Sequence, residues 1–303
     1  MIQSPDDSNS IVMNGVLIVD KPSGLTSHDV VNRVRRILKQ KAVGHLGTLD
    51  PLATGVLPLV LGNMTRLAQF YLASEKSYEG VIRFGFATDT YDAEGEPVGE
   101  PQQPLLTLEQ VRDLAGNFLG KIEQAPPPYS AKKIQGVRAY KLARKQKEVL
   151  LRPVQVEIKQ FEILGLEGTG AHFVARVASG TYMRSVAHEM GTRAGCGAHL
   201  ESLRRTAVAE FELEDAHTLE ELAQATQSGE MENMLVHPRK LLPSLPSVTA
   251  TDEIASKIRH GRPVNLPELS RAREVKVFYG QRDLIAISTR VAGTLFHPRI
   301  VLV

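Results

Sequence analysis

The stretch that decides how this chain is interpreted reads GHLGTLDPLATGVLP and runs from Gly44 to Pro58. It carries one acidic side chain, one imidazole, three glycines and two prolines, and its other residues are apolar or bear hydroxyls. Two prolines are incompatible with a regular helix, and an open loop would hold more charge. We therefore predict a tight, mostly buried loop that presents Asp50. Pro51 favours an extended backbone at Asp50, because a residue before proline avoids the helical region.

The partner of Asp50 is the first question that this loop raises. A lone carboxylate in apolar surroundings is costly unless a cation or hydrogen-bond donors pair with it. Leu49, Asp50 and Pro51 can form a simple Asx-turn in which backbone amides bind the carboxylate. Alternatively, Asp50 is a functional carboxylate that a cation from elsewhere in the chain holds ionised. The residues of the loop alone leave both interpretations open.

Composition places the chain among ordinary globular proteins. Of its 303 residues 42% are hydrophobic and 23% charged, which suits one large domain and a small one. The net charge is only +2, so a nucleic-acid surface must come from local clustering of Lys and Arg. No apolar run is long enough to span a bilayer, and the single cysteine, Cys196, fits a reducing compartment. We expect a cytoplasmic protein that does not enter a membrane.

Regular elements are predicted on both sides of the loop. Residues 1–12 are polar and are expected to be disordered, and 16–19 form a short apolar strand. Ser27 is the expected N-cap of a helix whose valines and isoleucine recur at helical spacing. After the loop we expect a strand over 57–61 and a helix over 65–72.

The segment that follows reads as a strand and an acidic turn. Alternation over 76–86 predicts a half-buried strand with Tyr78 and Phe84 on its buried face. A capping box at Thr107 opens the next helix. The acids between these two elements match no calcium-loop spacing and are interpreted as a solvated turn. They are Asp89, Asp92, Glu94 and Glu96.

A basic segment begins after three consecutive prolines. Between 132 and 152 the chain has eight basic residues and one acid, a local net charge of +7. Tyr129 and Tyr140 lie beside or within it. Positive charge next to aromatic rings binds phosphates and stacks bases, so we favour RNA binding over a solvated helix. The basic residues assigned to RNA contact here are Lys132, Lys133, Arg138, Lys141 and Arg144.

The run SGTYMR at 179–184 turns from a strand into a helix and places Arg184 in the first helical turn. A cation in this position opposes the helix dipole, so Arg184 is expected to have an anionic partner. Asp50 is the candidate partner, and the alternative is an arginine bonded to backbone carbonyls.

A linker with prolines at 238, 243 and 246 precedes the last part of the chain. Beyond it we expect a small, mainly β unit with a helix near Asp252 to Arg259. Its strands are predicted over 275–278, 284–288, 291–296 and 299–303. Such a unit is not expected to be an enzyme by itself.

Four motifs carry a resemblance to a known family. The run GHLGTLDPLATGVLPLVLG resembles the signature loop of the TruB-type pseudouridine synthases, which make pseudouridine in the T loop of tRNA. DKPSGLTS at 20–27, SGTYMR at 179–184 and LRRT at 203–206 resemble other motifs of that family. The resemblance implies that Asp50 is the catalytic carboxylate, acting as nucleophile or general base at the ribose, and that Arg184 pairs with it.

The resemblance also assigns residues to the substrate pocket. Tyr78 would stack on the target base and could take part in proton transfer, and Tyr182 and Leu203 would complete the walls. His45 would fill the space that the flipped base leaves in the RNA. Without the resemblance these four are ordinary loop and core residues.

Further residues would support the loop or face the RNA. Lys21 would pack beneath the active-site loop, and Arg204 and Arg205 would face the RNA. The basic insertion at about 124–152 resembles the thumb-like insertion that closes over the T arm. The unit over 246–303 resembles, in layout, a PUA-type RNA-binding barrel.

The resemblance implies an α+β fold, with a mixed, mainly antiparallel sheet in a catalytic domain over 13–245. The reaction is an isomerisation that breaks the N1–C1′ bond of a uridine and rejoins the base through C5. No cofactor or metal is expected, and the sequence has no phosphate-binding loop, dinucleotide fingerprint or zinc spacing. The expected partner is the T arm of tRNA, and we expect a monomer without an obligatory protein partner.

Three other functions remain open at the level of sequence. One is a non-catalytic RNA-folding protein on the same scaffold, a role that can also coexist with catalysis. Another is a glycoside hydrolase that uses Asp50 with Asp89 or Asp92 across one bond. The third is a guide-RNA-dependent relative of the family, against which the basic insertion favours direct gripping of tRNA.

Overall fold

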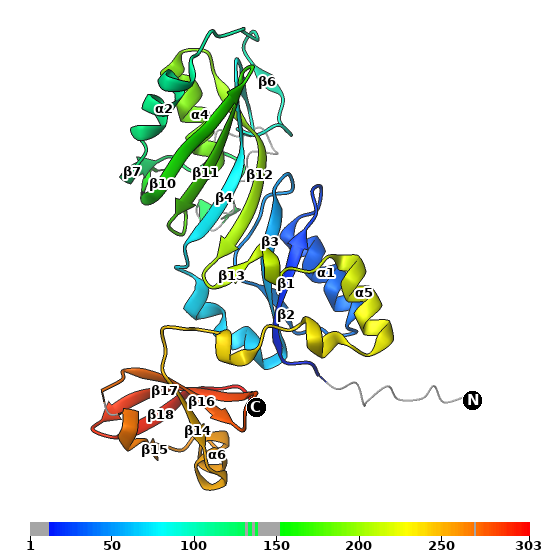
Figure 1. Ribbon diagram of the computed structural model, residues 1–303, viewed down its shortest axis with the longest axis vertical. Coiled ribbons are helices and arrows are strands. Elements are labelled where there is room, and N and C mark those ends of the chain that lie inside the picture. The colour runs from blue at the N-terminus through cyan, green and yellow to red at the C-terminus, as the bar shows by residue number, and fades with distance from the viewer. Residues whose placement is uncertain (1–11, 131–132, 135–136, 139–151, 270) are drawn as a thin grey trace, which may run out of the picture.

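The computed structural model describes residues 12–130, 133–134, 137–138, 152–269 and 271–303. Within them the chain is elongated and built on two main sheets, which lie in separate units in Figure 1. The larger sheet has nine strands and the smaller has five. The predicted α+β class, with a mainly antiparallel sheet and a smaller β unit, is confirmed. The expectation of disorder over 1–12 falls, except for Val12, outside the described residues.

The larger sheet follows one path from β1 to β7, and two strands lie off this path. All its pairs are antiparallel except one, which joins β3 and β12. In spatial order the strands are β1 (Gly15–Lys21), β3 (Thr54–Leu61), β12 (Ala198–Val208), β4 (Lys76–Phe84), β11 (Gly170–Val177), β10 (Val154–Glu167) and β7 (Gly120–Gln124). Off the path, β2 (Val43–His45) pairs with β3 and β13 (Phe211–Glu212) with β12.

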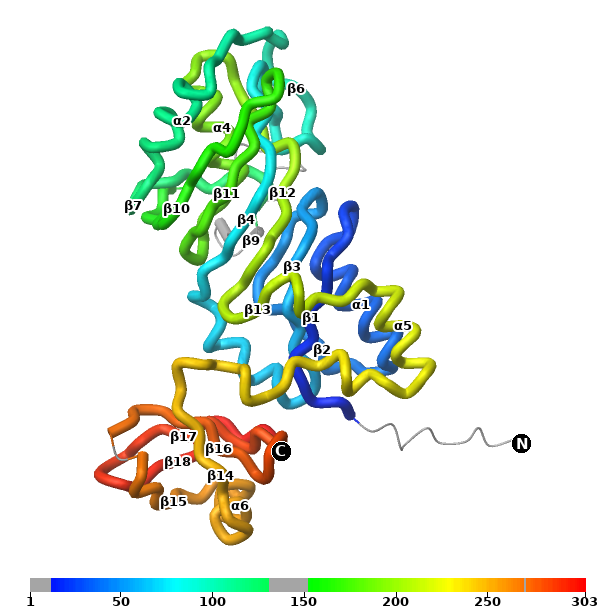
Figure 2. Tube along the Cα trace, in the orientation of Figure 1, coloured from blue at the N-terminus to red at the C-terminus, as the bar shows by residue number. Residues whose placement is uncertain are grey.

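The parallel pair joins two halves of the sheet that are far apart in the sequence. β12 lies along β4 and meets β3 near its end, where Arg204 is opposite Thr54 and Arg205 opposite Gly55 (Figure 2). Gly55 has φ +97°, and a Cβ there would lie 2.2 Å from the Arg205 carbonyl oxygen. Only glycine fits this left-handed, crowded position. The loop before β3 is therefore brought directly beside the LRRT run.

Helices cover each half of the larger sheet. α1 (Ser27–Ile37) and α5 (Leu219–Ser228) lie together beside β1, whereas α2 (Leu108–Gly116) packs on β10 and α4 (Met183–Ala194) on β12 (Figure 1). Buried residues of all four helices join the same apolar cluster as the sheet, among them Val30, Val111, Val186 and Leu222. None of the described helices is long and apolar enough to cross a membrane.

The start of α1 differs from the prediction. Thr26, not Ser27, is the N-cap: its side chain accepts from the Asp29 amide, and the Asp29 carboxylate accepts from the Thr26 amide at 3.0 Å. This capping box outcompetes Ser27, which has no acidic residue at the matching position. Ser27 lies inside the helix, where its hydroxyl is free to contact the loop at Leu49.

Elements near the loop keep their predicted type with shifted ends. β3 begins at Thr54 instead of 57, and the predicted helix over 65–72 is a 3-10 helix, η1 (Gly62–Tyr71). Tyr78 and Phe84 are buried on β4 as predicted. The shorter elements are β5 (Ala87–Thr88), β6 (Pro97–Val98), β8 (Lys133–Ile134), β9 (Val137–Arg138), η2 (Leu213–Asp215), η3 (Met231–Met234) and η4 (Pro238–Lys240).

The C-terminal unit starts at residue 247, close to the predicted boundary. Its strands are ordered β14 (Ser247–Ala250), β16 (Glu274–Tyr279), β17 (Asp283–Ala292), β18 (Leu295–Val301) and β15 (Val264–Asn265). α6 (Asp252–Arg259) has the predicted bounds, and η5 (Pro267–Leu269) follows β15. The predicted strands 291–296 and 299–303 are wrong. The hairpin turns at Gly293, whose φ of +50° suits a tight turn, so that β18 runs unbroken to Val301.

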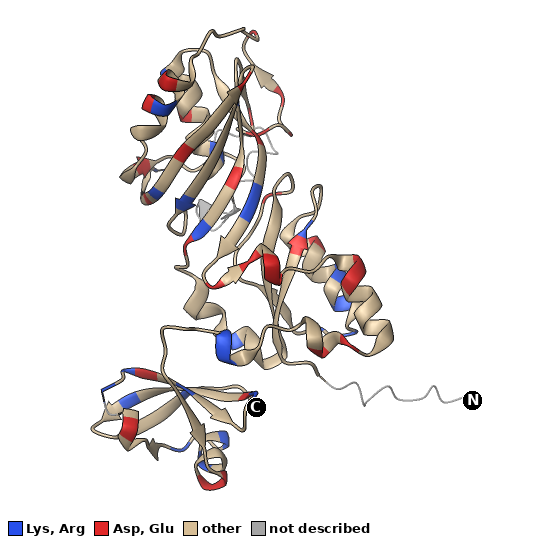
Figure 3. Cartoon of the chain, in the orientation of Figure 1, with Lys and Arg blue, Asp and Glu red and all other residues tan. Residues whose placement is uncertain are grey.

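The two units contact each other through an apolar cluster. Leu67 and Tyr71 of η1 share it with Phe278, Ile300 and Leu302 of the smaller unit. Charged side chains of both signs are distributed over both units (Figure 3), in keeping with the net charge of +2.

Candidate active site

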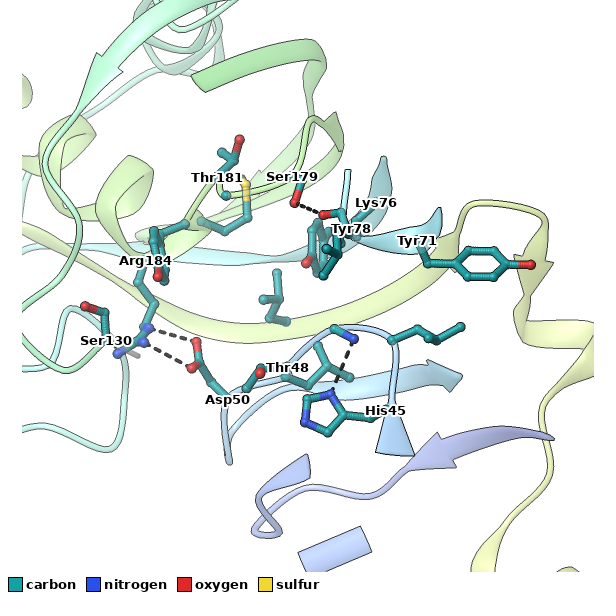
Figure 4. A pocket seen from close by; sticks show the side chains of 18 of the residues that line it. His45, Thr48, Asp50, Tyr71, Lys76, Tyr78, Ser130, Ser179, Thr181 and Arg184 are labelled. Atoms are coloured by element: carbon teal, nitrogen blue, oxygen red, sulfur yellow. Dashed lines mark hydrogen bonds and ion pairs between the residues drawn. The ribbon is translucent and has the colours of Figure 1, made fainter. Parts of the chain in front are cut away.

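A cavity of about 300 Å³ opens where the two halves of the larger sheet meet (Figure 4). Its walls come from the 45–50 loop, the end of η1 with Leu72, Lys76 and Tyr78 of β4, Ser130, the 179–184 turn and Leu203 of β12. Three of the sequence motifs therefore meet in one place, although the 44–58 loop lies more than a hundred residues before the other two. The larger part of the lining is apolar, and among the described residues that form it Asp50 is the one acidic side chain.

The loop that presents Asp50 is anchored by its apolar residues and by hydrogen bonds. Leu49 and Ala53 are buried in the main cluster. The Ser27 hydroxyl accepts from the Leu49 amide at 2.8 Å and donates to the Leu49 carbonyl at 3.1 Å. Lys21 is fully buried beneath the loop, and its ammonium donates to the carbonyls of Pro22 and Pro51 at 2.9 and 3.1 Å. Burial lowers the pKa of Lys21 to about 8, while Asp50 opposes the shift.

Arg205, on β12, supports the same loop and does not face the RNA as predicted. Its side chain is fully buried, and its guanidinium donates to the carbonyls of Val56, Thr48 and Gly47 at 2.8 to 3.2 Å. A buried guanidinium with these partners does not face RNA, so the predicted RNA contact of Arg205 is wrong. The alternation of a strand explains the error, because neighbouring residues point to opposite faces. Arg204 points outward and pairs with Asp20 at 2.8 Å.

Arg184 pairs with Asp50, as the sequence predicted. Its Nη2 donates to Asp50 Oδ1 at 3.0 Å, and its Nε lies 2.9 Å from Oδ2 (Figure 4). The alternative, an arginine bonded to backbone carbonyls, also holds. The guanidinium donates to the carbonyls of Thr90 and Tyr129 at 3.2 and 3.0 Å. The arginine side chain is 5% exposed and that of Asp50 is 35% exposed. The carboxylate is thus fixed from the protein side and open toward the cavity.

Asp92 is the residue of this site that the sequence interpretation missed. It was assigned to a solvated turn, but it is buried, and its Oδ2 lies 3.3 Å from Arg184 Nη1. Its Oδ1 accepts from the Thr90 hydroxyl at 2.6 Å and from the Glu94 amide at 3.1 Å. A single guanidinium is therefore shared by two carboxylates. Nothing local distinguishes Asp92 from the exposed acids around it, because its partner is more than ninety residues away.

These surroundings act on the pKa of Asp50 in opposite directions. Burial raises the pKa of the carboxyl, Arg184 lowers it, and the negative charge of Asp92 raises it again. The net direction of the pKa shift is upward, chiefly because burial disfavours the charged carboxylate, and Arg184 compensates only in part since it is shared with Asp92. The two aspartates and the arginine are thus electrostatically coupled.

The four residues assigned to the substrate pocket all line the cavity. Tyr78 is nearly buried in the wall, and Tyr182, the N-cap residue of α4, lies close enough to Asp50 for its pKa to be raised by burial and by that carboxylate. Leu203 is 8% exposed and lines the cavity. His45 lies on the loop, where its Nδ1 accepts from the Gly47 amide at 3.3 Å and burial lowers its pKa. His45 is consequently neutral at pH 7.

The predicted basic contacts with RNA are only partly within the described residues. Lys132, Lys141 and Arg144 lie outside them. The backbones of Lys133 and Arg138 belong to the two-stranded β8–β9 hairpin. The segment before the hairpin is tied to the site, since the Tyr129 carbonyl accepts from Arg184 and the Gln124 side chain bonds to the Tyr182 backbone.

The arrangement defines a particular class of site. One carboxylate, oriented by a buried guanidinium, faces a largely apolar cavity with two tyrosines. The cavity suits a flat base, and the carboxylate is positioned for attack or proton transfer at a sugar carbon. Asp92 is unavailable to a substrate because it lies buried beneath Arg184, so the two-carboxylate arrangement of a glycoside hydrolase is not formed.

Comparison with known proteins agrees with this class. The family model described as TruB family pseudouridylate synthase, N-terminal domain, matches residues 35–183. The model described as tRNA pseudouridylate synthase B C-terminal domain matches residues 184–243. The chain belongs to the TruB family of pseudouridine synthases, which are isomerases.

Individual relatives support the assignment along nearly the whole chain. A tRNA pseudouridine synthase B of Solibacter usitatus is 50% identical over 294 residues, which cover 96% of this chain and 100% of the relative. That of Aquifex aeolicus is 38% identical and covers 95% of this chain and 99% of the relative. Among solved structures, a chain of a Cbf5–Nop10–Gar1 complex matches with a TM-score of 0.70 and 25% identity, covering 95% of this chain and 85% of that one.

Proposed function

We propose that this enzyme isomerises the T-loop uridine at tRNA position 55 to pseudouridine, with Asp50 as the catalytic carboxylate. The observation that carries the proposal is the Asp50–Arg184 pair in the wall of the cavity. The relatives that match over nearly their full length are tRNA pseudouridine synthases B, which supports tRNA as the substrate.

The chemistry assigns a role to each group around the cavity. The N1–C1′ bond of the uridine breaks, the base turns, and C5 bonds to C1′ while the C5 proton is lost and N1 gains one. Asp50 acts at the ribose as nucleophile or general base. Tyr78 stacks on the base and is placed to take part in the proton transfer, and Tyr182 and Leu203 keep the detached base in place. His45 occupies the space that the flipped base leaves in the RNA.

The remaining surfaces bind the RNA around the flipped nucleotide. The basic insertion over about 124–152 grips the T arm, Arg204 contacts the RNA from β12, and the β unit over 246–303 acts as a PUA-like RNA-binding domain. We propose a monomer that needs no protein partner and works in the cytoplasm, where a free thiol such as Cys196 stays reduced. The packing between the two units through η1 supports their action as one RNA-binding surface.

The test is to map pseudouridine in an unmodified tRNA transcript after incubation with wild type, Asp50→Asn and Asp89→Asn. We expect one modified site in the T loop with the wild type and none with Asp50→Asn. Asp89→Asn is the matched control, because Asp89 is an exposed aspartate whose carboxylate accepts a hydrogen bond from the Glu96 amide. Full activity of Asp50→Asn would contradict the catalytic role. If that variant still aided tRNA folding, the RNA-folding function would be separate from the isomerase.

A further inference from the structure

A second cation lines the cavity on the side away from Arg184 (Figure 4). Lys76 begins β4, two residues before Tyr78, and is only partly exposed. Its ammonium donates to the Ser74 carbonyl at 2.6 Å. Within the described part of the chain no carboxylate lies within 4.0 Å of Lys76, and nothing in the catalytic scheme uses this charge.

The positive charge of Arg205, near Lys76, adds to the excess of positive charge on this side of the site. Arg205 is fully buried, and its hydrogen-bond partners in the loop are uncharged carbonyls. Both side chains approach Gly47: a Cβ at that residue would lie 3.7 Å from Arg205 Nη1 and 3.8 Å from Lys76 Cε. Arg205 does not line the cavity itself, but it thus adds a second positive charge behind Gly47 on the side where Lys76 lies. Arg184, in contrast, is balanced by two carboxylates.

An anion is the ligand that would correct this imbalance. Uracil and ribose carry no charge, so the anionic group that enters the cavity with a uridine is a phosphodiester of the RNA backbone. We propose that Lys76 forms a phosphate-binding subsite, in which its ammonium pairs with the phosphodiester adjoining the flipped uridine while Asp50 acts on the ribose. This inference rests on the proposed RNA isomerase function and names a binding contact within the same site.

The protonation of Lys76 gives the subsite a measurable signature. Burial lowers the pKa of Lys76 to about 8, and the charge of Arg205 adds to the shift. Among the described residues, the other titratable or charged groups that line the cavity are His45, Asp50, Tyr71, Tyr78, Tyr182 and Arg184. Since only the ammonium form pairs with phosphate, binding of RNA should weaken as pH rises through about 8. Arginine stays protonated throughout this range.

The first experiment measures the RNA concentration that half-saturates the single-turnover rate, from pH 6.5 to 9.5, with an unmodified T-arm stem–loop. For Lys76→Gln we expect the half-saturating RNA concentration to rise roughly tenfold at pH 7, the value of one charge-assisted hydrogen bond. The slope of its logarithm against the logarithm of salt concentration should be smaller by about one. Lys76→Arg should keep tight binding and lose the weakening above pH 8. Lys41→Gln, which removes an exposed lysine outside the cavity, is the charge-matched control.

The second experiment identifies the phosphate. The phosphodiesters on either side of the target uridine are replaced, one at a time, by uncharged methylphosphonates. At one of the two positions, the substitution should raise the half-saturating RNA concentration of wild type about tenfold. The same substitution should not raise that of Lys76→Gln any further, which would show that Lys76 and this phosphate are coupled. Equal losses in both proteins at both positions would overturn the proposal, as would an unchanged half-saturation and salt slope in Lys76→Gln.

The proposed function and the subsite fail in different ways. If wild type forms no pseudouridine in this RNA, the isomerase function is wrong and the subsite with it. If wild type is active and Lys76→Gln matches Lys41→Gln in every measurement, the function stands and the subsite is wrong.

Discussion

Two regions of the molecule hold the loop that carries Asp50 through buried arginines, and they do so by different means. Arg184, at the start of α4, binds the loop through the Asp50 carboxylate and is itself anchored by Asp92. Arg205, on β12, binds the backbone of the loop through three carbonyls. The first contact is an ion pair with the Asp50 carboxylate, whereas the hydrogen bonds of the second are made to uncharged carbonyls. Orientation of the carboxylate and placement of the loop are thus separate tasks.

Arg184→Met should break the first contact and give the largest effect. Without the guanidinium, Asp50 loses its orientation and faces Asp92 with no cation between them, so its pKa rises further. We expect the rate constant for pseudouridine formation to fall by about 1000-fold, measured in single turnover. The loss of stability in this variant should shrink as pH falls, because protonated carboxyls no longer repel each other. Activity within tenfold of wild type would contradict the role of Arg184.

Arg205→Met should break the second contact with a smaller effect on rate and a marked effect on stability. It leaves three loop carbonyls without their donor, and we expect a loss of about 3 kcal/mol in the free energy of unfolding. A shift of the loop should reduce the rate by about 100-fold. Denaturant unfolding at pH 5 and pH 8 gives the decisive comparison. If the loss in the free energy of unfolding varied with pH as it does in Arg184→Met, the two arginines would hold the loop in the same way, which would contradict the comparison.

Asp92→Asn should sharpen the comparison through the pH profile of activity. Burial holds the pKa of Asp50 above its usual value, and the charge of Asp92 raises it further. Because the reaction needs the carboxylate, activity is lost as pH falls through that pKa. Removing the charge of Asp92 should lower the pKa, so the acid limb of kcat/KM should move to lower pH. Asp89→Asn should leave the limb in place, and an upward shift in Asp92→Asn would contradict the assigned sign.

The smallest effect is expected where a stacked pair steadies the Asp92 segment. Tyr91 has φ +68°, in the left-handed region, and its ring stacks on His188 of α4 with centroids 3.7 Å apart. His188 lies one helical turn beyond Arg184, so the stack holds the Thr90–Asp92 segment on the face that carries the arginine. His188→Ala should lower stability by about 1 kcal/mol and the rate a few-fold. His188→Phe should restore both, and a variant as stable as wild type but equally slow would point to another role for His188.

The identity of the site was accessible from sequence because its motifs are local. The proline after Asp50 and the low charge of its loop indicated a fixed carboxylate, and the dipole argument at Arg184 named its partner. The elements that place these groups followed from periodicity and capping, with errors at their ends. Ser27 was misassigned because two hydroxyl residues competed for one N-cap, and only the Thr26–Asp29 pair completes a box.

The residues that sequence misjudged are those whose partners come from distant segments. Asp92 looked like its exposed neighbours, and Arg205 looked like Arg204. Only the antiparallel pairing of β12 with β4, and its parallel pairing with β3, turns Arg205 inward beneath the loop. Lys76 was not singled out at all, since one lysine at a strand start carries no local signal.

The amino-acid sequence by itself determined the family and pointed to Asp50 as the candidate catalytic carboxylate and to Arg184 as its candidate partner, because contiguous motifs of restricted composition encode them. The tertiary structure alone decided which other charges surround that carboxylate and whether each is balanced. Burial and pairing depend on groups brought together across the sheet, and the free energy of a charge is set by those neighbours and not by the residues beside it in the chain.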